Sequence, residues 1–187
     1  MNEISRDILK RARDGDMFAF QRIVETYQDY TFRLAFRLLA NEDDAKDAVQ
    51  ECFIRVWTHL KRYKSEKKFK PWLSRIVVNL CYDELKNAHK KHTVRNVLND
   101  ELLLPSTDEN FDDTLVNSEL AERIKSLANG LPPKQRIVFV LRDLEDLEIE
   151  DVAGIAGLSK NSVKSNLYYA RQHIRKRLKM TYEVHDM

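Results

Sequence analysis

The chain has 187 residues, of which 43% are hydrophobic and 33% charged, with only four glycines and four prolines. This length suits one large domain or two small ones, and scarce glycine beside abundant Leu, Ala, Lys and Glu predicts an all-α protein. No run of about 18 apolar residues is present, which excludes a membrane-spanning helix, and the charged first residues contain no signal-peptide stretch. We therefore expect a cytoplasmic protein without direct membrane insertion.

Apolar spacing in residues 1–92 predicts a helical bundle. Asp14-Gly15 ends a first short helix, and Asp16 is suited to cap the next one, because its carboxylate accepts hydrogen bonds from the free N–H groups of a first turn. Pro71 suits the first turn of a later helix. The predicted helices cover residues 4–13, 17–38, 44–60 and 71–88. Amphipathic helices joined by such short connections pack into a bundle.

Residues 93–117 lose this periodicity and become acidic, which predicts a flexible linker. Helical spacing returns over residues 118–187, where Asn129-Gly130 is expected to end one helix as a C-cap and Pro132-Pro133 to begin the next. Later helices are predicted over about residues 149–155 and 160–179. We thus expect two small helical domains joined by a flexible linker.

The second domain contains a segment with helix-turn-helix form. Gly157 can take a left-handed conformation after a short helix, and Ser159 can cap the helix that follows. On that second helix the stripe expected to pack inward is Val163, Leu167, Ala170, Ile174 and Leu178, and the outward face is Asn161, Lys164, Ser165, Tyr168, Gln172, Arg175 and Lys179. Arg171, at the edge of the apolar stripe, is either structural or phosphate-binding. The outward face suits the DNA major groove, and the alternative is a solvated basic helix.

The net charge of +2 is small, but its distribution is uneven. Residues 61–70 contain six basic side chains and one acidic one, and residues 159–179 contain seven basic and no acidic ones. Between them, residues 93–118 contain six acidic side chains and one basic one. Two cationic regions separated by an acidic connector predict a polyanion bound at two places.

The helix predicted over residues 44–60 has one apolar and one acidic side. Its inward residues are Ala45, Val49, Cys52, Phe53, Val56 and Leu60, and its outward residues are Asp44, Asp47, Gln50, Glu51 and Ile54, with Trp57 near the edge. An acidic stripe that also presents an isoleucine and an indole indicates a protein-docking face. The alternative is an ordinary solvated acidic face with a half-buried tryptophan.

Aromatic and basic side chains alternate between this helix and the next. Tyr63 and Phe69 lie among the lysines of residues 61–70, and Trp72 follows at the start of the next helix. This mixture suits single-stranded nucleic acid, because bases stack on aromatic rings while lysines follow the backbone. The alternative makes Phe69 and Trp72 core anchors of the loop–helix junction. Asn79, two helical turns beyond Trp72, can bond either a base edge or a neighbouring helix.

Three segments together resemble the extracytoplasmic-function (ECF) sigma factors of bacteria, a group within the primary sigma factor family. They are residues 44–57 (DAKDAVQECFIRVW), residues 69–83 (FKPWLSRIVVNLCYD), and residues 131–136 (LPPKQR) followed by the helix-turn-helix. The resemblance implies two helical domains with no catalysis of their own. It implies core RNA polymerase as partner, together with double-stranded −35 and single-stranded −10 promoter DNA, and an anti-sigma factor as regulator.

The resemblance also assigns surfaces to the two domains. Residues 1–92 would bind core polymerase and recognise and melt the −10 element, and residues 118–187 would recognise the −35 element. The expected polymerase-binding residues are Asp47, Gln50, Glu51 and Phe53, although the helical wheel turns Phe53 inward. The expected −10 residues are Tyr63, Lys64, Lys67, Lys68, Phe69, Trp72 and Asn79, and the expected −35 residues are Lys160, Lys164, Ser165, Tyr168, Arg171 and Arg175. Asn166 and Tyr169 stand where the family often has arginine.

Two other classes of function compete with this one. A stand-alone helix-turn-helix regulator would bind specific duplex DNA without polymerase, leaving the acidic face and the aromatic loop without a role. A DNA-directed enzyme with a metal ion would need carboxylates that converge in a cleft, whereas the acids here follow one helix face or the linker. His89 and His92 with Cys81 lack a fourth zinc ligand, and no phosphate-binding glycine loop is present. We expect no metal, no cofactor, and two reduced, buried cysteines.

Overall fold

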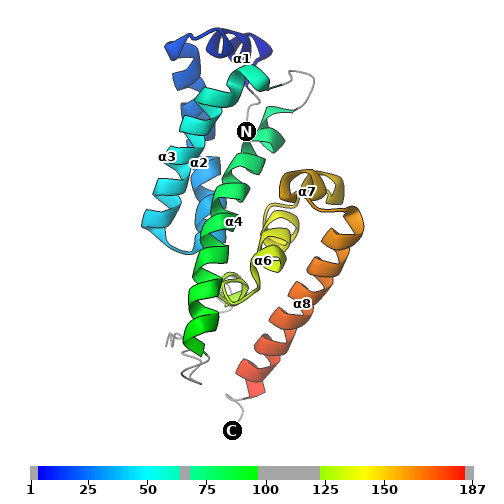
Figure 1. Ribbon diagram of the computed structural model, residues 1–187. Coiled ribbons are helices and arrows are strands. Elements are labelled where there is room, and N and C mark those ends of the chain that lie inside the picture. Colours follow the sequence, from blue (N-terminus) through cyan, green and yellow to red (C-terminus); the bar gives the residue numbers. More distant parts are fainter. Residues whose placement is uncertain (1–3, 64–67, 97–122, 184–187) are drawn as a thin grey trace, which may run out of the picture.

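The computed structural model describes residues 4–63, 68–96 and 123–183, with side chains described up to residue 87 in the fourth helix and up to residue 180 in the last. Within these residues the secondary structure is helical, which confirms the predicted all-α class (Figure 1). The helices are α1 (Arg6–Arg13), α2 (Met17–Leu39), α3 (Glu42–His59), η1 (Leu60–Arg62), α4 (Phe69–Asn96), α6 (Pro133–Phe139), η2 (Val140–Leu144), α7 (Ile149–Ala156) and α8 (Lys160–Glu183). Residues 123–128 are also helical.

Side-chain caps fix where the first helices begin. Asp16 accepts hydrogen bonds from the backbone N–H groups of Phe18 and Ala19 at 2.9 and 3.1 Å, as the sequence predicts. Asn41 caps α3 in the same way, which is why this helix begins at residue 42 and not at the predicted residue 44. Ala40 between α2 and α3 has a left-handed φ of 55°, which reverses the chain direction within two residues.

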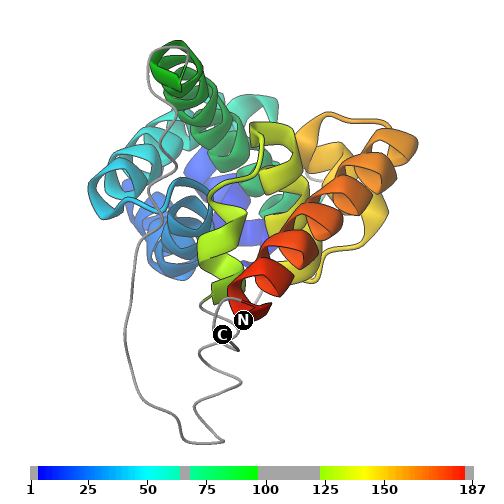
Figure 2. The same ribbon diagram turned by 90° about the horizontal axis from the view of Figure 1, so that it is seen from below.

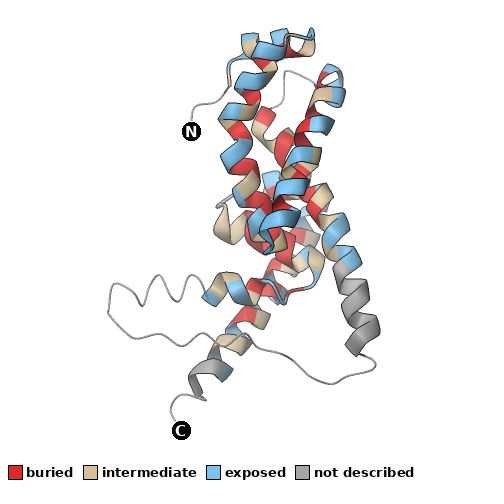
Figure 3. Cartoon of the chain, turned by 90° about the vertical axis from the view of Figure 1, so that its left-hand side faces the viewer, coloured by how far each residue is buried: buried red, intermediate tan, exposed pale blue. Residues whose placement is uncertain are grey.

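The first three long helices form the N-terminal bundle. α2 packs against both α3 and α4, and α1 covers one end of α2. Figure 3 shows the buried residues gathered where these helices face one another. The largest fully buried side chains from α2 are Tyr27, Tyr30, Ile23, Leu34 and Leu38. Burying such side chains contributes on the order of 1.5–3 kcal/mol each, so this core holds the acidic side of α3 in place.

The fourth helix ends later than the sequence predicts. α4 continues to Asn96, eight residues beyond the predicted end near residue 88, so the expected domain limit at residue 92 falls inside a helix. Residues 88–96 contain neither Gly nor Pro, and a formed helix extends at little cost through such a sequence. The first four residues of the predicted linker therefore form the last turn of α4, and residues 97–122 lie outside the described residues.

The C-terminal half contains the predicted helix-turn-helix in α7 and α8. Gly157 has φ 65°, and the Ser159 hydroxyl accepts a hydrogen bond from the Ser162 N–H at 3.2 Å, so both turn signals are confirmed. Gly130 does not adopt the left-handed conformation expected of a C-cap. Its missing side chain instead makes room for Arg177, because a Cβ atom at this position would lie 2.6 Å from a guanidinium nitrogen.

The two halves of the chain lie side by side. α6 and α7 pack on α4, and η2 contacts α2, so that α4 lies between the rest of the N-terminal bundle and the C-terminal helices. Figures 1 and 2 show α3 and α8 on opposite outer sides of the molecule. The acidic and basic surfaces predicted from the sequence therefore face away from each other.

Candidate protein and nucleic-acid interfaces

The acidic face of α3 (Asp44, Asp47, Gln50, Glu51 and Ile54) points outward. Asp44, Asp47, Gln50 and Ile54 are exposed, and Ile54 retains 59% of its surface. Glu51 is half-buried and accepts a hydrogen bond from Arg55 at 2.7 Å. An exposed isoleucine among carboxylates provides apolar area and negative charge on one surface, which suits a basic protein partner.

Phe53 has a different position from its neighbours on α3. It is 9% exposed and belongs to the core cluster, whereas the adjacent Ile54 is exposed. The helical wheel predicts this inward direction. Phe53 therefore supports the acidic face from beneath, in contrast to the outward contact that the family resemblance implies.

The aromatic residues of the loop–helix junction form one cluster. Ring centroids lie 5.4 Å apart for Tyr63 and Phe69, 5.2 Å for Tyr63 and Trp72, and 5.5 Å for Phe69 and Trp72. Phe69 also contacts Tyr27 of α2 at 5.3 Å. Tyr63 and Phe69 are buried and Trp72 is half-buried. Phe69 is therefore a core anchor of the loop–helix junction, whereas Trp72 is anchored there by only part of its side chain.

The polar −10 candidates are divided by what the structure describes. Lys68 and Asn79 are exposed, whereas Lys64 and Lys67 lie outside the described residues. Lys70 places its ammonium 4.2 Å from the centre of the Tyr30 ring. Asn79 is exposed on α4, which leaves its amide available to an external partner.

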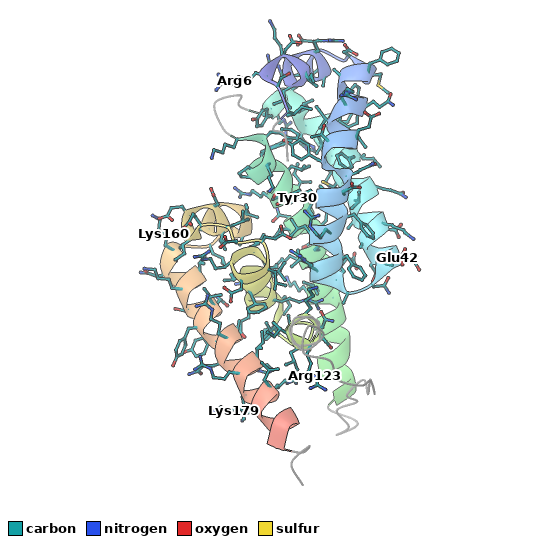
Figure 4. All side chains as sticks on the ribbon, turned by 180° about the vertical axis from the view of Figure 1, so that it is seen from behind. Arg6, Tyr30, Glu42, Arg123, Lys160 and Lys179 are labelled. Atoms are coloured by element: carbon teal, nitrogen blue, oxygen red, sulfur yellow. The ribbon has the colours of Figure 1, made fainter. Side chains whose placement is uncertain are left out.

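The basic face of α8 (Lys160, Lys164, Ser165, Tyr168, Arg171 and Arg175) is exposed along the helix. Figure 4 shows Lys160 near the beginning of α8 and Lys179 toward its other end, across the molecule from Glu42 of α3. The apolar stripe predicted to pack inward is buried at Val163, Leu167, Ala170 and Ile174, and Leu178 is half-buried. Tyr168 retains 58% of its surface, and its hydroxyl accepts a hydrogen bond from the Gln172 amide at 2.6 Å.

Two cations of the basic face are engaged within the protein. Arg171 donates two hydrogen bonds to Asp143 at 2.9 and 2.6 Å, and this contact raises the pKa of the guanidinium. Lys160 pairs with Glu150 of α7 and lowers the pKa of that carboxyl. Both pairs connect α8 to the preceding part of its domain, so either cation would have to release its carboxylate before it could contact a phosphate.

Asn166 has a structural role. Its amide donates a hydrogen bond to the Ser162 carbonyl oxygen at 2.8 Å, one turn earlier on α8. Tyr169 remains 57% exposed beside Tyr168, with ring centroids 5.5 Å apart. Where the family often has two arginines, this helix therefore presents one exposed ring and one amide bound to its own backbone.

The sequence predicts no role for Arg37, and Arg136 appears there only as the last residue of the LPPKQR segment. Arg37 of α2 bonds Leu144 and Glu145 of the C-terminal half, and Arg136 is buried. An isolated arginine on a predicted helix gives no local signal of a contact more than 100 residues away. Both residues lie where the two halves of the chain meet.

Within the described part of the chain, the cysteines and histidines do not form a metal site. Cys52 and Cys81 are free and buried, and burial raises the pKa of each thiol to about 12. No group of three His, Cys, Asp or Glu side chains able to hold a metal occurs among the described residues. The side chains of His89 and His92 lie outside that set. Among the described helices, none is both long and apolar enough to cross a membrane.

Two family models match the chain in order: Sigma-70 region 2 over residues 23–91, and Sigma-70, region 4 over residues 121–174. The ECF RNA polymerase sigma factor SigW of Bacillus subtilis is 28% identical over 183 residues, which cover 91% of this chain and 95% of SigW. The RNA polymerase sigma factor SigV of the same organism is 31% identical over 153 residues, or 82% of this chain and 86% of SigV.

Solved structures share the fold. CnrH in complex with the cytosolic domain of CnrY has a TM-score of 0.64 at 22% identity, covering 94% of this chain and 97% of CnrH. RpoE of Bartonella quintana in complex with the anti-sigma factor NepR has a TM-score of 0.62 at 22% identity, covering 86% and 96%. Two sigma regions in the family order, and a relative more than 30% identical over most of both chains, show that this chain belongs to the ECF RNA polymerase sigma factors.

Proposed function

We propose that this sigma factor recruits core RNA polymerase through the acidic face of α3 and brings it to promoters through two DNA-binding surfaces in separate domains. The observation that supports this most is that an exposed acidic helix and an exposed basic helix lie on opposite sides of one chain. One partner must be cationic and the other anionic, and both must bind at once. A stand-alone DNA-binding regulator would need only the second surface.

The polymerase surface consists of Asp47, Gln50 and Glu51, with Ile54 as its apolar component. Phe53 fixes the backbone beneath them by packing into the core. Charged groups around an apolar contact accelerate association and select the partner, while the apolar contact excludes water. A basic surface on polymerase is the complementary partner of this face.

The −10 strand would lie against the junction between η1 and α4. Trp72 offers a partly exposed ring for base stacking, which contributes about 1–3 kcal/mol per base, while Tyr63 and Phe69 fix that ring from below. Lys64, Lys67 and Lys68 follow the backbone and Asn79 bonds a base edge. Extracting a base from its stack costs a few kcal/mol, which these contacts offset.

The −35 duplex would receive α8 in its major groove. Lys164, Ser165 and Tyr168 lie on the exposed side of the first three turns, where a recognition helix reaches base edges. Lys160, Arg171 and Arg175 hold phosphates, the first two after releasing Glu150 and Asp143. Residues 118–187 form this reader. Residues 1–92 form the polymerase and −10 unit, and the acidic residues 93–117, of which 93–96 continue α4, connect the two.

The chain supplies specificity and polymerase supplies the catalysis, so no cofactor is needed and the site of action is the cytoplasm. We also propose an anti-sigma factor as regulator. Two fold relatives were solved with a protein partner, CnrH with the cytosolic domain of CnrY and RpoE with the anti-sigma factor NepR. Such a partner would act by covering the acidic face of α3.

Run-off transcription tests the central proposal. Core polymerase from the same organism should start at new sites on genomic promoters when this protein is added. Glu51→Arg should lose co-purification with core polymerase and lose those transcripts, while Lys164→Ala should keep co-purification and weaken the −35 footprint. Promoter binding that is equally tight without polymerase would instead establish the stand-alone regulator.

A further inference from the structure

Helix α8 exposes two adjacent aromatic rings. Tyr168 retains 58% of its surface and Tyr169 57%, and their ring centroids lie 5.5 Å apart at an interplanar angle of 72°. We call these two residues the tyrosine pair. Successive side chains on a helix point about 100° apart, so the pair extends across the exposed side of α8 and does not run along it. Two exposed rings in contact form an apolar patch of the kind found at binding sites.

The tyrosine pair is held in place by its own helix. The Gln172 amide, one turn later, donates a hydrogen bond to the Tyr168 hydroxyl at 2.6 Å. The Tyr169 ring meets the Tyr168 ring edge to face, which is a favoured geometry for aromatic contacts. Leu167 and Ala170, on either side of the pair in the sequence, are buried and fix the backbone that carries it. Side chains that are ordered before binding lose little conformational entropy when a partner binds.

The side chains around the tyrosine pair are polar or positively charged. Lys164 and Ser165 lie one turn earlier on α8 and Lys176 two turns later, and all three are exposed. Residues 159–179 contain no acidic side chain. This charge attracts a polyanion and repels a basic protein surface. The tyrosine pair is therefore an apolar patch inside a surface that is suited to DNA.

Tyr169 differs in chemistry from the arginine that the family often has at this position. A guanidinium can donate two hydrogen bonds to a guanine or to a phosphate, whereas an aromatic ring offers an apolar surface. The apolar group that bases present in the major groove is the C5 methyl group of thymine. Exchanging the guanidinium for a ring therefore changes the base edge that this position fits, from guanine to thymine.

We propose that the tyrosine pair reads the C5 methyl group of a thymine in the −35 duplex, and that Tyr169 is a specificity-determining residue of this sigma factor. The inference rests on the proposed function, because it requires α8 to lie in the major groove. Tyr169 is the tenth residue of α8, within the first three turns, where a recognition helix reaches base edges. Contact with the rings removes the methyl group from water. Burying one such carbon group strengthens binding by about fourfold.

Removing the methyl group from the DNA tests the proposal directly. The probe is a promoter duplex that the holoenzyme of this chain and core polymerase protects at −35, with each −35 thymine on either strand replaced in turn by deoxyuridine, which lacks only the methyl group. The wild type should bind one of these duplexes about fourfold more weakly than the parent duplex. Tyr169→Ala should bind both equally, and Tyr169→Phe, which keeps the ring, should discriminate as the wild type does. Met180→Ala, on the same side of α8 three turns later and also 57% exposed before the change, is the matched control and should discriminate fully.

Three results would overturn the proposal. Equal binding of the thymine and deoxyuridine duplexes by the wild type would show that no methyl group is read. Discrimination that persists in Tyr169→Ala would assign the reading to another residue. Loss of polymerase binding by Tyr169→Ala, with an unchanged preference for thymine, would make the tyrosine pair a protein-docking surface.

The proposed function fails in a different way. No −35 protection by any form of the chain would overturn that function, whereas protection without discrimination would overturn only the reading of thymine. Circular dichroism verifies that each variant is folded, and Tyr169→Gln replaces Tyr169→Ala if the latter is not.

Discussion

Helices α3 and α8 are both amphipathic, but their exposed faces carry opposite charge. Each buries an apolar stripe in its own half of the chain and exposes a polar stripe on an outer side of the molecule. On α3 the exposed stripe carries Asp44, Asp47 and the nearby Glu51, and on α8 the residues from 160 to 179 include no acid. The packing of the two helices follows from their apolar periodicity, whereas the partners proposed for them follow from the sign of the exposed charge.

The two helices also differ in how their charges are held. On α3 the ion pairs run along the helix itself, as in Lys46 with Glu42 at 2.7 Å and Arg55 with Glu51 at 2.7 Å. On α8 the pairs reach other elements, as in Arg171 with Asp143. A partner can therefore approach the acidic face of α3 without changing the fold around it. In the proposed −35 complex, contact of Lys160 or Arg171 with a phosphate would require that cation to release its carboxylate partner on another element.

The largest expected effect breaks the apolar support of the acidic face. Phe53→Ala should lower the free energy of unfolding by about 3–5 kcal/mol, because it leaves a cavity in the core beneath α3. The adjacent Ile54→Ala is the matched control and should change it by less than about 0.5 kcal/mol. Urea denaturation followed by circular dichroism measures both. Equal stability of the two variants would show that Phe53 is a surface residue, as the family resemblance implies.

The next prediction reverses the charge of one exposed residue on α3 without changing how the helix packs. Asp47→Lys should weaken binding to core polymerase about tenfold, or about 1.4 kcal/mol, while the unfolding transition stays unchanged. Asp7→Lys makes the same charge change at an exposed site on α1 and is the control. Fluorescence anisotropy with labelled protein measures both affinities. A similar loss in both variants would indicate a response to net charge alone.

The buried and exposed faces of α3 and α8 are predictable from the sequence because the signals for them are local. Apolar residues three or four positions apart define the buried stripes of α3 and α8, and the caps at Asp16 and Ser159 set where helices begin. The end of α4 is not predictable in this way, since no Gly or Pro marks it. Tyr63 and Phe69 lie at a junction without helical period, so only the structure shows that they are buried.

The docking of the two halves has no sequence signal at all. Arg37 and Glu145 are 108 positions apart; Arg37 is an isolated charge in an apolar stretch of α2, and Glu145 is one of several charged residues close together in the sequence. Their pairing depends on how α2 and η2 are brought together by packing around α4. Periodicity identifies the faces of single helices, whereas a contact between two faces depends on the shapes of both.

A third prediction tests the basic face of α8 by removing one of its positive charges. Lys164→Ala should weaken binding to a −35 duplex about fivefold, or about 1 kcal/mol, and should reduce the slope of log affinity against log salt by about 0.9. Lys10→Ala on α1 removes the same charge from an exposed site and should change neither quantity. Titrations at several salt concentrations measure both. An unchanged slope in Lys164→Ala would show that this lysine does not replace a counterion on the DNA.

The smallest expected effect concerns the concentration of like charge on α8. Burial, followed by Arg177 and Lys176, lowers the pKa of His173 below its ordinary value of 6.5, and its Nε2 is buried without a hydrogen-bond acceptor. The folded protein therefore binds this proton less tightly than the unfolded chain, so His173 favours folding above about pH 6.5 and this contribution is lost as the pH falls. His173→Gln should make the free energy of unfolding less dependent on pH between about 7 and 5, by at most about 0.5 kcal/mol because water screens this partly exposed site. Identical pH profiles for wild type and variant would show that α8 accepts another positive charge as easily as the unfolded chain does.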